Sequence, residues 1–204
     1  MRIGNTSIDD RSGDLVITTK IHCQPLMQTL DSLRYPIGDF VYGKNYATND
    51  TQQHIVAIEN LPIKLTELVG KWGDDRLDAP YRPGGWTVRQ LVHHIADSHM
   101  NAYIRTKLTL TEDTPTVKPY EEGEWAKLPD SRLDIAPSLV ILRNLHLRWT
   151  TVLSSLTDGD LDRTYFHPAS QRTVTLREAI AMYVWHGEHH YQHAFRLAVR
   201  NEWR

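Results

Sequence analysis

Apolar side chains recur at spacings of three and four residues along four stretches of this chain, a pattern typical of helices with one buried face. The first stretch contains Ile55, Ile58, Leu61, Leu65, Leu68 and Trp72. Asn49, Asp50 or Thr51 is expected to cap this helix, because each side chain can accept a hydrogen bond from a free backbone N–H group. Pro62 is expected to kink it, since proline supplies no N–H to the preceding turn.

The second and fourth stretches each begin with a capping box, in which a threonine and a glutamate or glutamine three residues later bind each other's backbone N–H groups. Thr87 and Gln90 have this spacing, and Thr175 and Glu178 repeat it. The two pairs predict helices that cover about residues 88–111 and about residues 176–200.

The third stretch follows a connection of more than 20 residues that contains three prolines. Loops of this length in compact domains are often functional. Pro137 suits a first helical position, which predicts that the third helix begins there. Its apolar positions are Leu139, Leu142, Leu145, Trp149, Val152 and Leu156.

Four helices and no convincing sheet predict an all-α protein, a four-helix bundle over residues 35–204. The long connection can cross the bundle, so that the second and third helices run parallel. Residues 1–34 show little helical periodicity and are expected to form an N-terminal extension whose structure the pattern does not determine; the segment GDLVITTKIH is compatible with a short strand but has no obvious partner. Bundles of this kind commonly hold ligands and metals with side chains on facing helices.

Composition and charge narrow the class of partner. The chain has 204 residues, with 23 Lys and Arg against 25 Asp and Glu, and this balance offers no electrostatic attraction to nucleic acid or to an anionic membrane. Cys23 is the only cysteine, which excludes an intrachain disulfide and a thiolate-rich zinc cluster. No apolar run reaches the roughly 20 residues of a membrane span. We therefore expect a cytoplasmic protein whose partner is a small molecule.

Four histidines fall within the segment VWHGEHHYQHAF of the fourth helix. At 100° per residue, His186, His190 and His193 lie in the apolar stripe and His189 lies at its edge, whereas Glu188 faces away. The segment also differs from the HExxH motif of metalloproteases, whose glutamate follows the first histidine directly. Two histidines four residues apart can share one metal ion, although such pairs also occur as hydrogen-bonded core residues.

A third ligand can come from the second helix, which carries His93, His94 and His99. Helical phase alone favours His99, because the other two lie away from the apolar face. Three imidazoles with one open position are typical of a catalytic zinc site. Asp97 can orient a ligand or remain a solvated aspartate. The other histidines are expected to be surface or packing residues: His22, His54, His146 and His167.

Several of these segments resemble the YfiT-like branch of the DinB superfamily. They are YPIG at 35–38, residues 80–120, LHLRWT at 145–150 and YVWHGEHHYQHAF at 183–195. The resemblance implies a four-helix bundle with an up-down-down-up course, a homodimer, and one divalent metal ion per subunit, zinc or nickel. It also implies the ligands: His94, eight residues after Trp86, together with His186 and His190.

Members of this family are described as metal-dependent hydrolases. The resemblance therefore implies hydrolysis of a small molecule by a metal-bound water, with the metal polarising a substrate carbonyl. Two alternatives remain open. DinB relatives include enzymes that join a low-molecular-weight thiol such as bacillithiol to an electrophile, and a metal-bound thiolate would need no general base. A non-catalytic bundle stabilised by its metal is the second alternative, and a fourth protein ligand would identify it.

Overall fold

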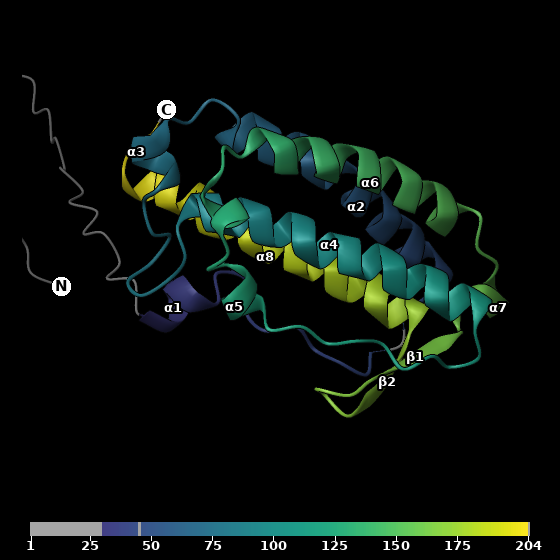
Figure 1. The fold of residues 1–204 in the computed structure, drawn as a ribbon. Coiled ribbons are helices and arrows are strands. Elements are labelled where there is room, and N and C mark those ends of the chain that lie inside the picture. Colours follow the sequence, from purple (N-terminus) through teal and green to yellow (C-terminus); the bar gives the residue numbers. More distant parts are fainter. Residues whose placement is uncertain (1–29, 45, 204) are drawn as a thin grey trace, which may run out of the picture.

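The computed structural model describes residues 30–44 and 46–203, and within them four long helices lie side by side in a bundle (Figure 1). The bundle helices are α2 (Thr48–Val69), α4 (Val88–Thr111), α6 (Ala136–Ser154) and α8 (Leu176–Arg200). The shorter elements are α1 (Leu30–Arg34), α3 (Asp74–Leu77), α5 (Glu122–Trp125), η1 (Pro129–Arg132), α7 (Asp158–Leu161), β1 (Thr164–His167) and β2 (Arg172–Thr175). The predicted four-helix bundle is confirmed. The strand predicted in GDLVITTKIH lies outside the described residues.

The helices follow the up-down-down-up course. The start of α4 contacts the start of α6, where His93 meets Ser138. The later turns of the two helices also meet, where Trp149 of α6 donates a hydrogen bond to Thr106 of α4. These two helices are therefore parallel, and α2 and α8 run in the opposite direction. The connection from α4 to α6 returns along the length of the bundle and carries α5 and η1 (Figure 1).

The capping box predicted for α4 is present in full. Thr87 Oγ1 accepts from the backbone N–H of Gln90 at 3.1 Å, and Gln90 Oε1 accepts from the backbone N–H of Thr87 at 3.0 Å. Two otherwise free N–H groups are thereby satisfied, and the helix begins at Val88 as predicted.

Only half of the capping box predicted for α8 forms. Thr175 Oγ1 accepts from the backbone N–H of Glu178 at 3.1 Å, so α8 begins at Leu176 as predicted. The carboxylate of Glu178 instead accepts from the backbone N–H of Gly43 at 2.7 Å and from Arg172 at 3.2 Å. These two partners lie outside the helix, so Glu178 ties the segment before α2 and strand β2 to α8.

Helix α2 begins earlier than predicted and continues through its proline. Ala47 occupies the N-cap position. Asp50, in the first turn of the helix, accepts a hydrogen bond from the backbone N–H of Ala47 at 3.2 Å. Pro62 lies inside the helix and leaves the carbonyl of Ile58, four residues earlier, without a helical donor. His146 Nδ1 supplies the missing hydrogen bond at 2.6 Å.

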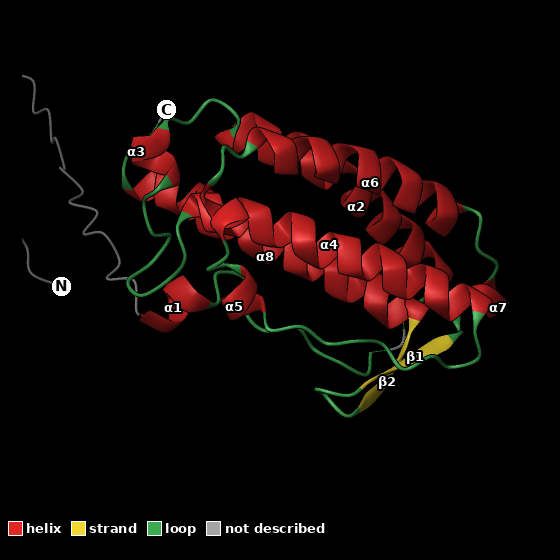
Figure 2. Cartoon of the chain, in the orientation of Figure 1, coloured by secondary structure: helices red, strands yellow, loops and turns green. Residues whose placement is uncertain are grey.

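The expectation that the chain has no sheet is wrong. Strands β1 and β2 form an antiparallel hairpin directly before α8, with Tyr165 opposite Val174 (Figure 2). Each strand has four residues, too few for an alternating pattern to stand out in the sequence. The two paired side chains are buried, so the hairpin packs on the bundle as a short flap.

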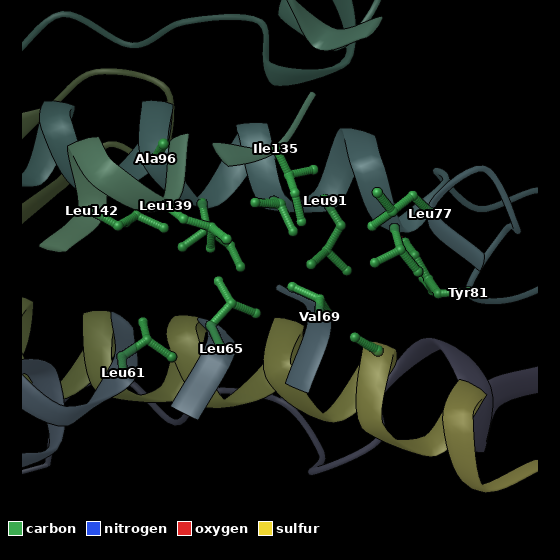
Figure 3. Packing of buried hydrophobic residues seen from close by; sticks show 14 of the residues in the cluster. Leu61, Leu65, Val69, Leu77, Tyr81, Leu91, Ala96, Ile135, Leu139 and Leu142 are labelled. Carbon is green, nitrogen blue, oxygen red and sulfur yellow. The ribbon is translucent and has the colours of Figure 1, made fainter. Parts of the chain in front are cut away.

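The core lies between the helices, where apolar side chains from α2, α4 and α6 point toward one another (Figure 3). Helix α8 packs so close to α2 at Gly187 that a Cβ placed on this glycine would lie 2.5 Å from Leu61 Cδ2. Helix α4 is buried on most of its circumference in its first three turns, since α6, α8 and the long connection surround it. Among the described residues, no helix is long and apolar enough to cross a membrane.

Candidate metal centre

His94 on α4 and His186 and His190 on α8 come together between the two helices. One ring nitrogen from each lies within 4.8 Å of the others. The ring centroids of His94 and His190 are 4.8 Å apart, and those of His186 and His190 are 4.5 Å apart. The three histidines that the family resemblance selects therefore form one cluster that could hold a metal ion.

The spacing of two nitrogens fits a shared ion. His94 Nε2 lies 3.2 Å from His186 Nε2. Two imidazoles bound to one tetrahedral ion at about 2.0 to 2.1 Å would hold their nitrogens about 3.3 Å apart. In addition, Nδ1 of His190 is buried without a hydrogen-bond partner among the described residues, as are the Nδ1 atoms of His189 and His193. A divalent ion is a group that such a cluster of nitrogen donors can accommodate.

Burial keeps these rings in the form that binds metals. It lowers the pKa of His94 to about 4. The pKa values of His186 and His190 lie well below the ordinary value, first because of burial and then because neighbouring histidines repel a second proton. All three imidazoles are therefore neutral at physiological pH, and no proton has to be removed from a charged ring before a metal binds.

The cluster opens onto a cavity of about 400 Å³. Trp86, whose ring centroid lies 4.8 Å from that of His94, forms one wall. Arg82 and Glu122 are the only charged side chains among the described residues that line it. The lining is Tyr81, Arg82, Gly84, Gly85, Trp86, His94, Glu122, Trp185, His186, His189 and His190. This volume suits a small-molecule ligand.

The turn before Trp86 depends on two glycines. Gly84 has a φ of +68°, a conformation that favours glycine, and a Cβ on Gly85 would lie 2.8 Å from Arg82 Cγ. This turn carries Arg82 and Trp86 to the cavity. Sequence reasoning did not assign Arg82 or Glu122 to the site, because both lie on connections whose course the helical pattern does not fix.

The other two histidines of α4 do not join the cluster. His93 points toward α6, where Nδ1 meets Ser138 Oγ at 2.7 Å and Nε2 donates to the carbonyl of Leu133 at 3.1 Å. His99, which helical phase favoured as a ligand, instead contacts His186 through its own Nε2 at 3.3 Å. His99 therefore contacts Nδ1 of the candidate ligand His186, the ring nitrogen that does not face His94.

His189 and His193 form a second close group with His190. His193 donates from Nε2 to the carbonyl of Arg34 at 3.2 Å and stacks on Tyr81 with centroids 4.1 Å apart. His189 stacks on Trp185 at 4.7 Å. These contacts join both rings to the segment before α2 and to the cavity wall. The Nδ1 atoms of His189 and His193 are nevertheless buried without a hydrogen-bond partner among the described residues, and this second group could also hold a metal ion.

The two acidic residues considered near the site lie away from it. Glu188 pairs with Lys64 on α2 at 2.6 Å, so it faces away from the cluster as predicted. Among the described residues, Asp97 makes no hydrogen bond to His94, so of the two alternatives for Asp97 the orienting contact is not made. Burial, and then Asp130, raises the pKa of Asp97 to about 6.

The four helices form a bundle, and the histidine cluster between α4 and α8 opens onto a cavity. These features place the chain in the class of helix-bundle proteins with an internal candidate metal centre. Comparison with known families makes this specific. The sequence pattern of the DinB superfamily matches residues 57–194, and the chain belongs to that superfamily.

Close relatives occur in bacilli. A protein of Bacillus cereus (strain 03BB102) and one of Bacillus thuringiensis subsp. konkukian (strain 97-27), both named "Putative metal-dependent hydrolase", are each 49% identical over 174 residues, which cover 85% of this chain and 100% of theirs. The solved structure of YfiT from Bacillus subtilis is described as a probable metal-dependent hydrolase with an unusual four-helix bundle topology. It is 45% identical, with a TM-score of 0.83, over 85% of this chain and 99% of that one.

Proposed function

We propose that this chain is a metal-dependent hydrolase that holds one divalent ion, zinc or nickel, with His94, His186 and His190. The observation that carries the proposal is the 3.2 Å separation of His94 Nε2 and His186 Nε2 at the cavity wall. The names of the relatives support the same class of activity. Bound there, a divalent ion supplies a Lewis acid for a substrate carbonyl and lowers the pKa of a coordinated water towards about 7.

An open site supports a catalytic role over a purely structural one. Among the described residues, no fourth side chain of a ligating type joins the three histidines. A structural zinc site normally has four protein ligands, whereas a catalytic site keeps one position for water or substrate.

The cavity walls bind and orient the substrate in this proposal. Arg82 can hold a carboxylate or another anionic group, and Glu122 can hold a cationic group or accept a proton. Trp86 and Trp185 provide flat apolar walls against which the body of a small molecule packs. We expect Glu122→Gln to lower kcat for hydrolysis while leaving the metal content unchanged.

A thiol transferase is the second candidate, and one observation favours it. Glu122 is the only carboxylate among the described residues that line the cavity, and it is exposed, so no buried general base is positioned there. A low-molecular-weight thiol bound as its thiolate would need no such base.

Product analysis separates the two candidates. Zinc-loaded and nickel-loaded protein would be incubated with activated esters, amides and electrophiles, with and without a small thiol, and products identified by mass. Hydrolysis without thiol that is lost in His94→Ala supports the hydrolase. Adduct formation that strictly requires thiol, and is also lost in His94→Ala, would replace it with the transferase. Absence of stoichiometric metal after reconstitution would remove both.

A further inference from the structure

A line of buried hydrogen bonds connects the backbone of α2 to the candidate ligand His186. His146 Nδ1 lies 2.6 Å from the carbonyl oxygen of Ile58, and His146 Nε2 lies 2.9 Å from His99 Nδ1. His99 Nε2 then lies 3.3 Å from His186 Nδ1. The rings of His99 and His146 are 0% and 1% exposed, so water does not compete for these contacts.

The starting point of this line is fixed by a proline. In a regular helix the carbonyl of Ile58 would accept from the N–H of residue 62, but Pro62 has none. The freed oxygen can only accept a hydrogen bond. His146 Nδ1 must therefore carry a proton and donate it to Ile58.

The direction of every later bond follows from that first one. A neutral imidazole has one N–H and one lone pair. With its proton on Nδ1, His146 can only accept at Nε2, so His99 donates from Nδ1 and keeps its lone pair on Nε2. His186 must then donate from Nδ1, which leaves the lone pair of His186 on Nε2.

That lone pair points into the candidate metal centre. His186 Nε2 is the atom that lies 3.2 Å from His94 Nε2. Among the described residues, no carboxylate is hydrogen-bonded to His99 or His146, and charged rings in so apolar a place would be costly. Outer contacts of this kind commonly fix the tautomer and orientation of histidine ligands, and here imidazoles serve in place of the usual carboxylate or carbonyl.

We propose that His99 and His146 are positioning residues, which hold His186 in the tautomer with its proton on Nδ1 and so present Nε2 to the metal. The effect on metal binding rests on the proposed function, whereas the tautomer itself does not. Each member comes from a different helix: Ile58 from α2, His146 from α6, His99 from α4 and His186 from α8.

The variants separate the acceptor role of His99 from its bulk. His99→Phe fills a similar volume but offers His186 no acceptor, and His99→Asn places its amide near the former Nδ1, out of reach of His186. His99→Gln can place an oxygen near the former Nε2 and is expected to restore the contact. His93→Phe is the matched control, because His93 is also a buried, doubly hydrogen-bonded histidine of α4 but its partners are Ser138 and Leu133 and not a candidate ligand.

The first measurement is the tautomer of His186 in metal-free protein, read from ring nitrogen and hydrogen shifts after labelling histidine with ¹⁵N. We expect the proton on Nδ1 in the wild-type protein and in His99→Gln, and a mixture or reversal in His99→Phe. A wild-type His186 with its proton on Nε2 would overturn the proposal, whether or not the protein binds metal.

The second measurement is zinc affinity by competition with a chromophoric chelator, with circular dichroism to verify folding. We expect a loss on the order of 10 to 100-fold for His99→Phe and His99→Asn, and little change for His99→Gln or His93→Phe. Wild-type affinity in a folded His99→Phe would overturn the positioning role. If the wild-type protein binds neither zinc nor nickel, the proposed function fails, and the tautomer measurement still decides the assignment of the hydrogen-bonded line.

Discussion

Lowering the pH is expected to destabilise the metal-free protein through His146, which lies in the core away from the three candidate ligands. Burial lowers the pKa of His146 from 6.5 to about 4. The folded ring therefore stays neutral at pH values where the ring in the unfolded chain takes up a proton. Because the unfolded state binds more protons, this contribution to stability is complete above pH 6.5 and is lost as the pH falls toward about 4.

The magnitude follows from the same two pKa values. At about 1.4 kcal/mol per pKa unit, the whole contribution is about 3 kcal/mol, of which about 2 kcal/mol would be lost between about pH 7.5 and about pH 5. A typical domain has a free energy of unfolding of only about 5 to 15 kcal/mol. One buried histidine is therefore expected to produce a measurable acid sensitivity.

Urea unfolding at a series of pH values, with a chelator present and helicity as the signal, tests this expectation. His146→Asn is the matched variant, because its amide lies near the former Nδ1 and can donate to the Ile58 carbonyl but cannot gain a proton. The variant should be less stable than the wild-type protein near neutral pH, and the difference should shrink by about 2 kcal/mol toward about pH 5. Parallel pH profiles for the two proteins would refute the reasoning.

Three further substitutions test the site and its packing. His190→Ala should weaken zinc binding by more than about 100-fold, beyond the loss of an outer partner, while circular dichroism shows a folded bundle. His193→Ala removes the contacts to Arg34 and Tyr81 and the ring contacts to His189 and His190, but none of the three proposed ligands, so its zinc affinity should stay near that of the wild-type protein; a complete loss would place it among the ligands. Gly187→Val should cost about 1 to 3 kcal/mol in urea unfolding through its clash with Leu61, and additivity with Leu61→Ala would contradict that contact.

The helix pattern could be predicted from the sequence where local chemistry decides it. The threonines at 87 and 175 place the starts of α4 and α8, because a cap depends on residues within one turn. The cap of α2 and the β1–β2 hairpin were not predicted correctly. Ala47 has no side-chain acceptor to mark the helix start, and four-residue strands depend on their packing against the bundle.

The residues of the candidate site could not all be predicted from hydrophobic periodicity alone. His94 lies off the main apolar face of α4, and only the family resemblance selected it. The physical reason is that α4 is enclosed on several sides, so one apolar stripe does not define its interior. His146 was expected to be a surface or packing residue, and it is buried. Its position four residues after Leu142 and three before Trp149 was the available signal.

The line from Ile58 to His186 makes the candidate metal centre dependent on the completed fold. Only α4 and α8 supply candidate ligands, yet the line that ends at His186 also passes through α6 and begins on α2. A ligand that binds only the native state stabilises every element whose order it requires. Metal binding should therefore slow hydrogen exchange in α2 and α6 as well as in the two ligand-bearing helices, so that the four helices open as one cooperative unit.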